Sequence, residues 1–309
     1  MKSVTHQVGI DVDKRYLVIS IDQAPALRID NEESAIGEFA SKLPAGSVVH
    51  LEASGGYQRM ARRVLTNAGH TVHVHNALKV RRLAQAQGTR AKTDPLDARG
   101  LSRSGHLLPV SPGRSEERQK LTDLSRTKEI ITKTIGQFKV RAKSPDLDED
   151  ARQALMHVID VLEKKAAMLE DLFEERVKCT PYARQYGLCR SLPGIGRASA
   201  RAIVCELPED VLDRSPGQIA SYAGVAPIDA SSGSREGVYL GRGNLHLKKA
   251  LFMPAVCSLK QPWARELYAR LRAKGRCHSS AIVAVMRRLL IRVIAVLHRG
   301  TPWEIAPVT

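Results

Sequence analysis

The chain has 309 residues, enough for about two domains and a substantial buried core, which excludes a short disulfide-stapled scaffold. Lysine and arginine number 48 against 32 aspartate and glutamate, so the formal net charge of +16 indicates a polyanionic partner. Hydrophobic residues make up 43% and charged residues 26% of the chain, which argues against disorder throughout.

The first 75 residues alternate between strand and helix patterns. Apolar runs and period-two alternation predict five strands, and apolar residues at helical spacing predict two helices. The predicted strands are Val8–Val12, Tyr16–Ile21, Ala26–Ile29, Val48–Leu51 and Thr71–His75, and the predicted helices are Asn31–Ser41 and Tyr57–Ala68. This order, βββαβαβ, predicts an α/β domain in which helices pack on a mixed five-stranded sheet.

The remainder of the chain has the pattern of helices. Residues 76–106 are basic and are expected to face a phosphate backbone. Apolar spacing over 115–178, broken at 144–150, predicts a long helical hairpin or coiled coil that acts as a spacer or oligomerisation segment. A second compact and mostly helical region begins at Pro181 and ends in a strongly basic tail. The predicted domains are therefore 1–110, 111–180 and 181–309.

Neither the cysteines nor the apolar segments indicate secretion or a membrane. The five cysteines are scattered, without a Cys-x-x-Cys pair for zinc or redox chemistry, as in reduced cytoplasmic proteins. The N-terminal residues lack the long apolar run of a secretory signal. The most apolar stretch, Ala281–Leu297, contains Arg287, Arg288 and Arg292, so we expect a helix of a cytoplasmic protein without membrane contact.

Two carboxylates follow apolar strands in the first domain. Asp11 comes after the run Val-Gly-Ile, although Asp-Val-Asp-Lys is also ordinary turn chemistry. Glu52 directly follows Val-Val-His-Leu and precedes Ala-Ser-Gly-Gly, a loop small enough for a large ligand to approach. The predicted sheet brings the ends of its first and fourth strands, and hence these two carboxylates, close together.

Two more carboxylates, Asp94 and Asp97, are three residues apart at a predicted helix start and can share one face. Helix capping is the alternative role, because Pro95 suits the first helical position. Four carboxylates offer only oxygen ligands and suit one or two Mg²⁺ ions, which leave positions open for phosphate oxygens. In a chain of charge +16, such an acidic cluster needs a metal to approach DNA.

Five segments carry a family resemblance. In chain order they are GIDVDK, HLEASGGY, VHNALKVRRLAQAQGTRAKTDPLDARGLS, SLPGIGRASA and YAGVAPIDASSGSREG. Together they resemble the insertion-sequence one-ten family of transposases, which includes the Piv/MooV pilin-gene invertases, over nearly the whole chain. The resemblance implies a RuvC-like (RNase H-like) catalytic domain over 1–110, whose acidic set is Asp11, Glu52, Asp94 and Asp97, and a C-terminal transposase domain.

The C-terminal domain of this family carries a catalytic serine in a Ser-Gly loop. Here the loop reads PIDASSGSREG, and the resemblance assigns the nucleophile to Ser232, with Ser231 and Ser234 as neighbouring alternatives. The residues alone are typical of a flexible loop. Attack on a phosphodiester needs an activated oxygen and a stabilised pentacoordinate phosphorus, part of which a metal at the carboxylates would supply.

Several residues are candidates for nucleic-acid contact. The segment Leu-Pro-Gly-Ile-Gly with Gly194 and Gly196 is similar to a helix-hairpin-helix, in which backbone N–H groups meet a phosphate; a tight helix-helix turn is the alternative. The candidate cationic side chains are Lys79, Arg81, Arg82, Arg90, Lys92, Arg235, Arg242, Lys248, Arg288 and Arg292. His73 and His75 share a strand face, but no third ligand is close in sequence, so we do not expect a metal there.

The resemblance implies a DNA transposase or site-specific recombinase in which Ser232, assisted by Mg²⁺, forms a covalent protein–DNA intermediate. It also implies donor and target DNA, a structured non-coding guide RNA encoded by the element, and a homodimer that pairs into a tetramer. Two alternatives stay open. One is a Mg²⁺-dependent nuclease like a Holliday-junction resolvase, in which water attacks, and the other is a non-catalytic nucleic-acid-binding protein.

Overall fold

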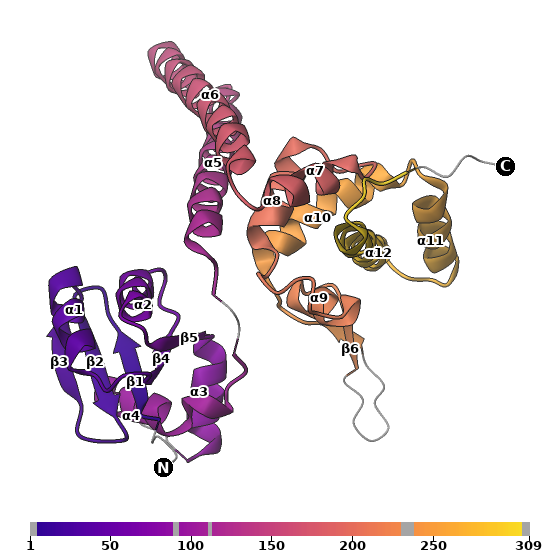
Figure 1. Ribbon diagram of the computed structural model, residues 1–309. Coiled ribbons are helices and arrows are strands. Elements are labelled where there is room, and N and C mark those ends of the chain that lie inside the picture. Colours follow the sequence, from indigo (N-terminus) through magenta and orange to yellow (C-terminus); the bar gives the residue numbers. More distant parts are fainter. Residues whose placement is uncertain (1–4, 89–92, 111–112, 230–237, 305–309) are drawn as a thin grey trace. The chain divides into compact units, whose positions relative to one another are not determined.

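The computed structural model describes residues 5–88, 93–110, 113–229 and 238–304 (Figure 1). The chain divides into two compact units, Met1–Gly113 and Arg114–Thr309, and each has its own hydrophobic core. Within the described residues the first unit combines a sheet with helices, and the second is almost entirely helical. The predicted combination of an α/β part with a helical part is confirmed.

The first unit is built on a five-stranded mixed sheet, as the sequence predicted. Its strands are β1 (Gln7–Val12), β2 (Tyr16–Ile21), β3 (Leu27–Asp30), β4 (Val48–Glu52) and β5 (Thr71–His75). The spatial order is β3-β2-β1-β4-β5. β2 runs antiparallel to β1 and β3, whereas β4 is parallel to β1 and β5. The strands β1 and β4 therefore end at the same edge of the sheet.

Side-chain alternation gives this sheet two different faces. Val8, Ile10 and Val12 of β1 are buried in the core that α1 (Glu33–Lys42) and α2 (Gln58–Asn67) cover. The intervening residues Gly9 and Asp11 lie on the opposite face, because successive side chains of a strand point in opposite directions. One face is thus an apolar core, and the other carries the polar residues of β1.

The polar face is covered by α4 (Asp94–Ser104), which packs on β1, β2 and β4 (Figure 1). The approach is close because Gly9 has no side chain: a Cβ there would lie 2.1 Å from the carbonyl oxygen of Ala98 and 2.2 Å from the backbone nitrogen of Ser102. The helix α3 (Ala77–Ala86) packs against α4, and the short 3-10 helix Gly105–Leu107 follows it. The sheet is therefore enclosed between two helical layers.

The second unit begins with a hairpin of two long helices, α5 (Glu116–Ala142) and α6 (Glu149–Lys178). Ile135 and Ile159 are buried between them. Lys139 pairs across the hairpin with Glu163 at 2.6 Å, a partly exposed contact that adds little to stability. The predicted helical hairpin and its break near 144–150 are confirmed.

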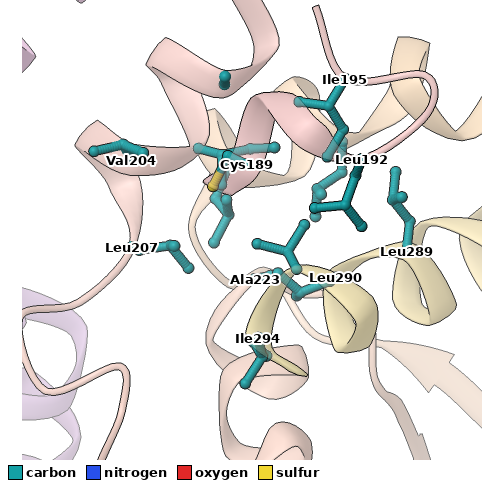
Figure 2. Close-up of a cluster of buried hydrophobic side chains, with 14 of the residues drawn as sticks. Cys189, Leu192, Ile195, Val204, Leu207, Ala223, Leu289, Leu290 and Ile294 are labelled. Atoms are coloured by element: carbon teal, nitrogen blue, oxygen red, sulfur yellow. The ribbon is translucent and has the colours of Figure 1, made fainter. Parts of the chain in front are cut away.

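In the described residues of the second unit, six shorter helices form its body. They are α7 (Ala183–Ser191), α8 (Arg197–Glu206), α9 (Pro216–Tyr222), α10 (Leu245–Ser258), α11 (Pro262–Ala273) and α12 (His278–Arg299), with the short strands β6 (Pro227–Asp229) and β7 (Val238–Leu240). Leu289, Leu290 and Ile294 of α12 pack into a core with Cys189 and Val204 (Figure 2). None of the helices in the described part of the chain combines the length and apolar character that crossing a membrane requires.

A buried carboxylate fixes the hairpin to this body. Glu206, at the end of α8, is 2% exposed and pairs with Arg114 at 2.5 Å and Arg126 at 2.9 Å. Asn244 donates a further hydrogen bond of 3.0 Å. Burial raises the pKa of Glu206, but its bonds to Arg126, Arg114 and Asn244 outweigh burial and lower the pKa below the usual value. The charged network therefore joins the start of α5 to α8 and α10.

Candidate active site

Asp11 and Glu52 lie on neighbouring strands at one edge of the sheet. Asp11 is the penultimate residue of β1, and Glu52 is the last residue of β4. The parallel register pairs Ile10 with Leu51, so these two carboxylates come next along each strand. Both lie on the α4 face, because Ile10 and Leu51 point into the opposite core. The strand pairing on which their proximity depends is the one predicted from the sequence.

The first turn of α4 carries Asp94 and Asp97 to the same edge. The hydroxyl of Tyr16 donates a hydrogen bond of 3.2 Å to Asp94 Oδ2, and this bond raises the pKa of Tyr16. Tyr16 begins β2, directly after the turn that follows β1, so the start of α4 lies near the end of β1. The N-cap position belongs to Thr93, so Asp94 is not the capping residue. Asp94 and Asp97 are the acidic residues of the first turn, a position that also suits the helix dipole.

The turn role expected of the Asp-Val-Asp-Lys segment belongs to Asp13. Its backbone N–H donates to the carbonyl oxygen of Tyr16 at 3.0 Å, and its carboxylate accepts a bond of 2.9 Å from the N–H of Arg15. This backbone hydrogen bond lowers the pKa of Asp13. Asp11 instead belongs to the strand and accepts a bond of 3.1 Å from the N–H of Val12. Asp13 is therefore a matched control for substitutions of Asp11.

Three histidines gather on the same sheet face, next to Glu52. His50 is the register partner of His73, and Glu52 is the partner of His75. Nδ1 of His50 lies 2.9 Å from Nε2 of His75, and one nitrogen of each ring lies within 4.8 Å of the other two. Burial, with smaller contributions from neighbouring positive groups, lowers the pKa of His50 and of His75 to about 4, and burial lowers that of His73.

No third ligand lies close to His73 and His75 in the sequence, but the structure brings one to them. The third histidine, His50, is far away in the sequence and comes alongside because β4 and β5 pair in parallel. The two strands separately give no sign of this cluster. The only sequence signal that could have found it is the matching position of His50 and His73 in two strands predicted to be neighbours.

The first unit also presents basic side chains on α3. Lys79, Arg81 and Arg82 are exposed there. Two further candidates for nucleic-acid contact, Arg90 and Lys92, lie outside the described residues. The exposed cations on α3 provide positive charge for a phosphate backbone, and their contact with nucleic acid stays a prediction.

The two predicted glycines of the second unit lie in the turn between α7 and α8. Gly194 has a φ of +94°, and a Cβ there would meet the Oγ of Ser258 at 2.8 Å, so both its conformation and its packing favour glycine. Gly196 is exposed and occupies the N-cap position of α8. A tight turn explains Gly194 without a ligand, whereas the backbone N–H groups after Gly196 are the part of this turn suited to a phosphate.

A cationic pocket of about 530 Å³ is formed by α11 and α12. It is lined by Trp263, Glu266, Leu267, Arg270, Arg288 and Arg292. The guanidinium of Arg292 lies over the ring of Trp263, 3.8 Å from its centroid, and burial lowers the pKa of Arg292. The sequence indicated Arg288 and Arg292, but Trp263 was missed because it lies on another helix.

The remaining predicted residues belong to the second unit. Arg242 is exposed, and Lys248 is partly buried on α10. The predicted nucleophile Ser232, its alternatives Ser231 and Ser234, and the cation Arg235 lie outside the described residues.

Comparison with known families assigns the two parts of the chain. Residues 8–145 match a DEDD-type domain described as a transposase, and this range includes all four carboxylates. Residues 187–269 match the family described as Transposase IS116/IS110/IS902, and this range includes the serine loop and the turn between α7 and α8.

Individual relatives agree with these matches. The chain is 28% identical over 268 residues to the pilin gene-inverting protein of Moraxella lacunata. The aligned residues cover 84% of this chain and 83% of the relative. The pilin gene-inverting protein of Moraxella bovis gives the same identity and coverage. A protein of the insertion element IS110 from Streptomyces coelicolor is 35% identical over 117 residues, 37% of this chain and 29% of that protein.

The sheet with its edge carboxylates and the two family matches define the class of this protein as a transposase, an enzyme that recombines DNA. Within that class, the chain belongs to the IS110 family of transposases.

Proposed function

We propose that this transposase cuts and rejoins the DNA of an insertion element through a serine nucleophile, assisted by Mg²⁺ at Asp11, Glu52, Asp94 and Asp97. The observation that carries the proposal is the convergence of β1, β4 and the start of α4, each with a carboxylate, at one edge of a mixed five-stranded sheet. The match to a DEDD-type transposase domain supports divalent-metal use by this part of the chain.

The donor set fits Mg²⁺ in its chemistry. Carboxylate oxygens are the ligands that Mg²⁺ prefers, and two or three of them leave coordination positions for phosphate oxygens. The bound ion would supply Lewis-acid stabilisation of the charge that develops on a phosphate. Tyr16 has a positioning role, because its bond to Asp94 holds the start of α4 against β2.

Ser232 is the proposed nucleophile, supported by the family match over 187–269. In the proposed step its oxygen forms a bond to a DNA phosphorus, one backbone P–O bond breaks, and the released DNA end takes the proton as a hydroxyl. The resulting phosphoserine ester conserves the energy of the broken bond for rejoining. The related pilin gene-inverting proteins are named for the inversion of a gene, which agrees with a cut-and-rejoin reaction.

Positive charge supports nucleic acids as the proposed partners. The exposed cations of α3, the turn after Gly196 and the pocket that contains Arg288 are proposed to contact phosphates. Donor and target DNA would be selected by pairing with a structured RNA encoded by the element, held by the same basic surfaces. The α5–α6 hairpin is proposed as the segment through which dimers form and pair into tetramers.

A recombination assay in cells tests the proposal. The protein is expressed with its natural element and flanking sequences, and recombined junctions are quantified for Asp11→Asn, Glu52→Gln, Ser232→Ala and the control Asp13→Asn. We expect the first three to lose recombination and Asp13→Asn to retain it. Recombination by Asp11→Asn at the level of the control would contradict the role of the carboxylates. Retention by Ser232→Ala alone would contradict the nucleophile and favour attack by water.

A further inference from the structure

The histidine cluster on β4 and β5 is a separate feature from the carboxylate edge. His50 and His75 are almost completely buried, and His73 is partly buried. Nδ1 of His73 and Nδ1 of His75 are buried without a hydrogen-bond partner among the described residues. Buried polar atoms are normally satisfied, so the unpaired Nδ1 of His73 requires an explanation that packing alone does not give.

Gln7 fixes the orientation of the central ring. Nε2 of His50 donates a hydrogen bond of 2.9 Å to Oε1 of Gln7, which leaves the lone pair of His50 Nδ1 directed at His75. Gly105 lies directly against the same ring, since a Cβ there would be 2.3 Å from His50 Cγ, so the ring cannot swing away. A histidine whose second nitrogen is anchored on an amide or carboxyl oxygen is the usual arrangement behind a metal ligand.

We propose that His50, His73 and His75 form a binding site for a transition-metal ion of the zinc class, which ties β5 to β4 beside Glu52. Three imidazoles with one open position are a recurrent ligand set for Zn²⁺. Zinc–nitrogen bonds of about 2.0–2.1 Å in tetrahedral geometry separate ligand nitrogens by about 3.4 Å. The nitrogens here lie within 4.8 Å of one another, so a small rotation of partly buried His73 and a slight lengthening of the 2.9 Å contact between His50 and His75 close the site.

The site differs from the carboxylate edge in the metal it selects. Imidazole nitrogen suits zinc, copper and nickel, whereas carboxylate oxygen suits Mg²⁺. In the absence of the ion, the proton on His75 Nε2 satisfies His50 Nδ1 through the 2.9 Å contact. Binding through His75 Nε2 moves that proton to Nδ1 of the same ring, so the imidazole stays neutral and no net proton is released. The ion takes the place of the shared proton between the two rings.

The expected consequence is a local stabilisation next to the sheet edge that carries Asp11 and Glu52. Glu52 is two residues from His50 and is the register partner of His75. An ion that joins these histidines therefore restrains the end of β4, on which Glu52 stands. The inference does not depend on the proposed function, because metal binding is measured without DNA.

The test uses the full chain without a histidine tag, stripped of metal with a chelator. Zn²⁺ is titrated in excess Mg²⁺, and bound zinc is quantified after buffer exchange. The samples are the natural chain, His73→Ala, and the control His157→Ala, which replaces an exposed histidine of α6. We expect one zinc per chain and a raised melting temperature for the natural chain and the control. His73→Ala should bind at least tenfold more weakly. Equal binding by all three, or no binding by the natural chain, would overturn the proposal.

A second measurement needs no substitution and so holds even where His73→Ala fails to fold. The zinc-loaded natural chain is studied by X-ray absorption at the zinc edge. A first shell of nitrogen near 2.0–2.1 Å with the outer scattering of about three imidazole rings supports the histidine site. A shell dominated by oxygen or sulfur assigns the ion to other residues and overturns it.

Discussion

Substitution of Gly9 by alanine tests whether α4 holds its carboxylates in place by direct contact with β1. The added Cβ would lie 2.1 Å from the carbonyl oxygen of Ala98 and 2.8 Å from Cβ of Leu101. Ordinary contact begins at 3.4 Å, so 3.4 − 2.1 gives about 1.3 Å by which the helix must move away from the strand. Because these neighbours are backbone atoms of α4 and a Cβ fixed to it, a side-chain rotation cannot relieve the contact.

Two effects follow from that displacement. Overpacking costs about 1–3 kcal/mol, and the upper end applies where backbone must move; the lower chain entropy of alanine offsets about 0.5–1 kcal/mol. The net loss in the free energy of unfolding is about 2 kcal/mol, which a unit of ordinary stability survives. A shift near 1 Å of Asp94 and Asp97 from Asp11 should reduce recombination about 100-fold.

Hydrogen exchange with mass spectrometry measures this effect locally in the full chain. Peptides from β1 and α4 should exchange faster in Gly9→Ala by the equivalent of about 2 kcal/mol. The control is Gly37→Ala in α1 of the same unit, where a Cβ meets nothing within 4 Å and helix propensity predicts unchanged or slower exchange. Exchange in Gly9→Ala within 0.5 kcal/mol of the natural chain, with full recombination, would refute the direct packing of α4 on β1.

Three further outcomes are expected. Replacing Glu206 by alanine leaves Arg114 and Arg126 facing an empty buried site, so the free energy of unfolding of the second unit should fall by about 3–5 kcal/mol. A loss under about 1 kcal/mol in a denaturant titration would contradict the stabilising role of this network. For His50 and His75, the pKa of about 4 in the folded chain lies below the ordinary value of 6.5. Between these two pH values the unfolded chain therefore binds more protons than the folded chain. The stability that the two neutral rings contribute is present above pH 6.5 and is lost as the pH falls towards 4. The loss is on the order of 3 kcal/mol when the first of these two hydrogen-bonded rings takes a proton. Metal-free protein whose first unit keeps equal protection factors at pH 7 and pH 5, after correction for the intrinsic exchange rate at each pH, would contradict it. Arg288→Gln in the cationic pocket should weaken DNA or RNA binding and lower its salt dependence by about one counterion, whereas an unchanged salt slope would exclude a phosphate contact.

The sheet was predictable because its pattern is local. The alternation of Val8, Ile10 and Val12 defines a strand and its buried face, and the short connection to Tyr16 leaves an antiparallel neighbour as the simple solution. Every predicted strand lies within a residue or two of the observed one. The break between the two long helices was likewise visible, because the apolar spacing stops there.

Features that depend on contacts between distant segments were not predictable in the same way. The histidine cluster requires the exact pairing of His50 with His73, which strand patterns alone do not specify. The stacking of Arg292 on Trp263 depends on the packing of α11 against α12. The N-cap of α4 is Thr93, one residue before Asp94, the N-cap that the following Pro95 suggests. Both residue types are good N-caps, and tertiary packing decides between them.

A covalent protein–DNA adduct is the direct test of whether a serine and the carboxylates at the sheet edge act in one reaction, as proposed. Purified protein is incubated with Mg²⁺, labelled element-end DNA and RNA transcribed from the element's flanks, and the products are separated under denaturing conditions. We expect labelled DNA attached to the protein, absent with Ser232→Ala and with Asp11→Asn, and present with Asp13→Asn. Cleaved DNA without any adduct, unaffected by Ser232→Ala and abolished by Asp11→Asn, would contradict the serine mechanism and identify a metal-dependent nuclease.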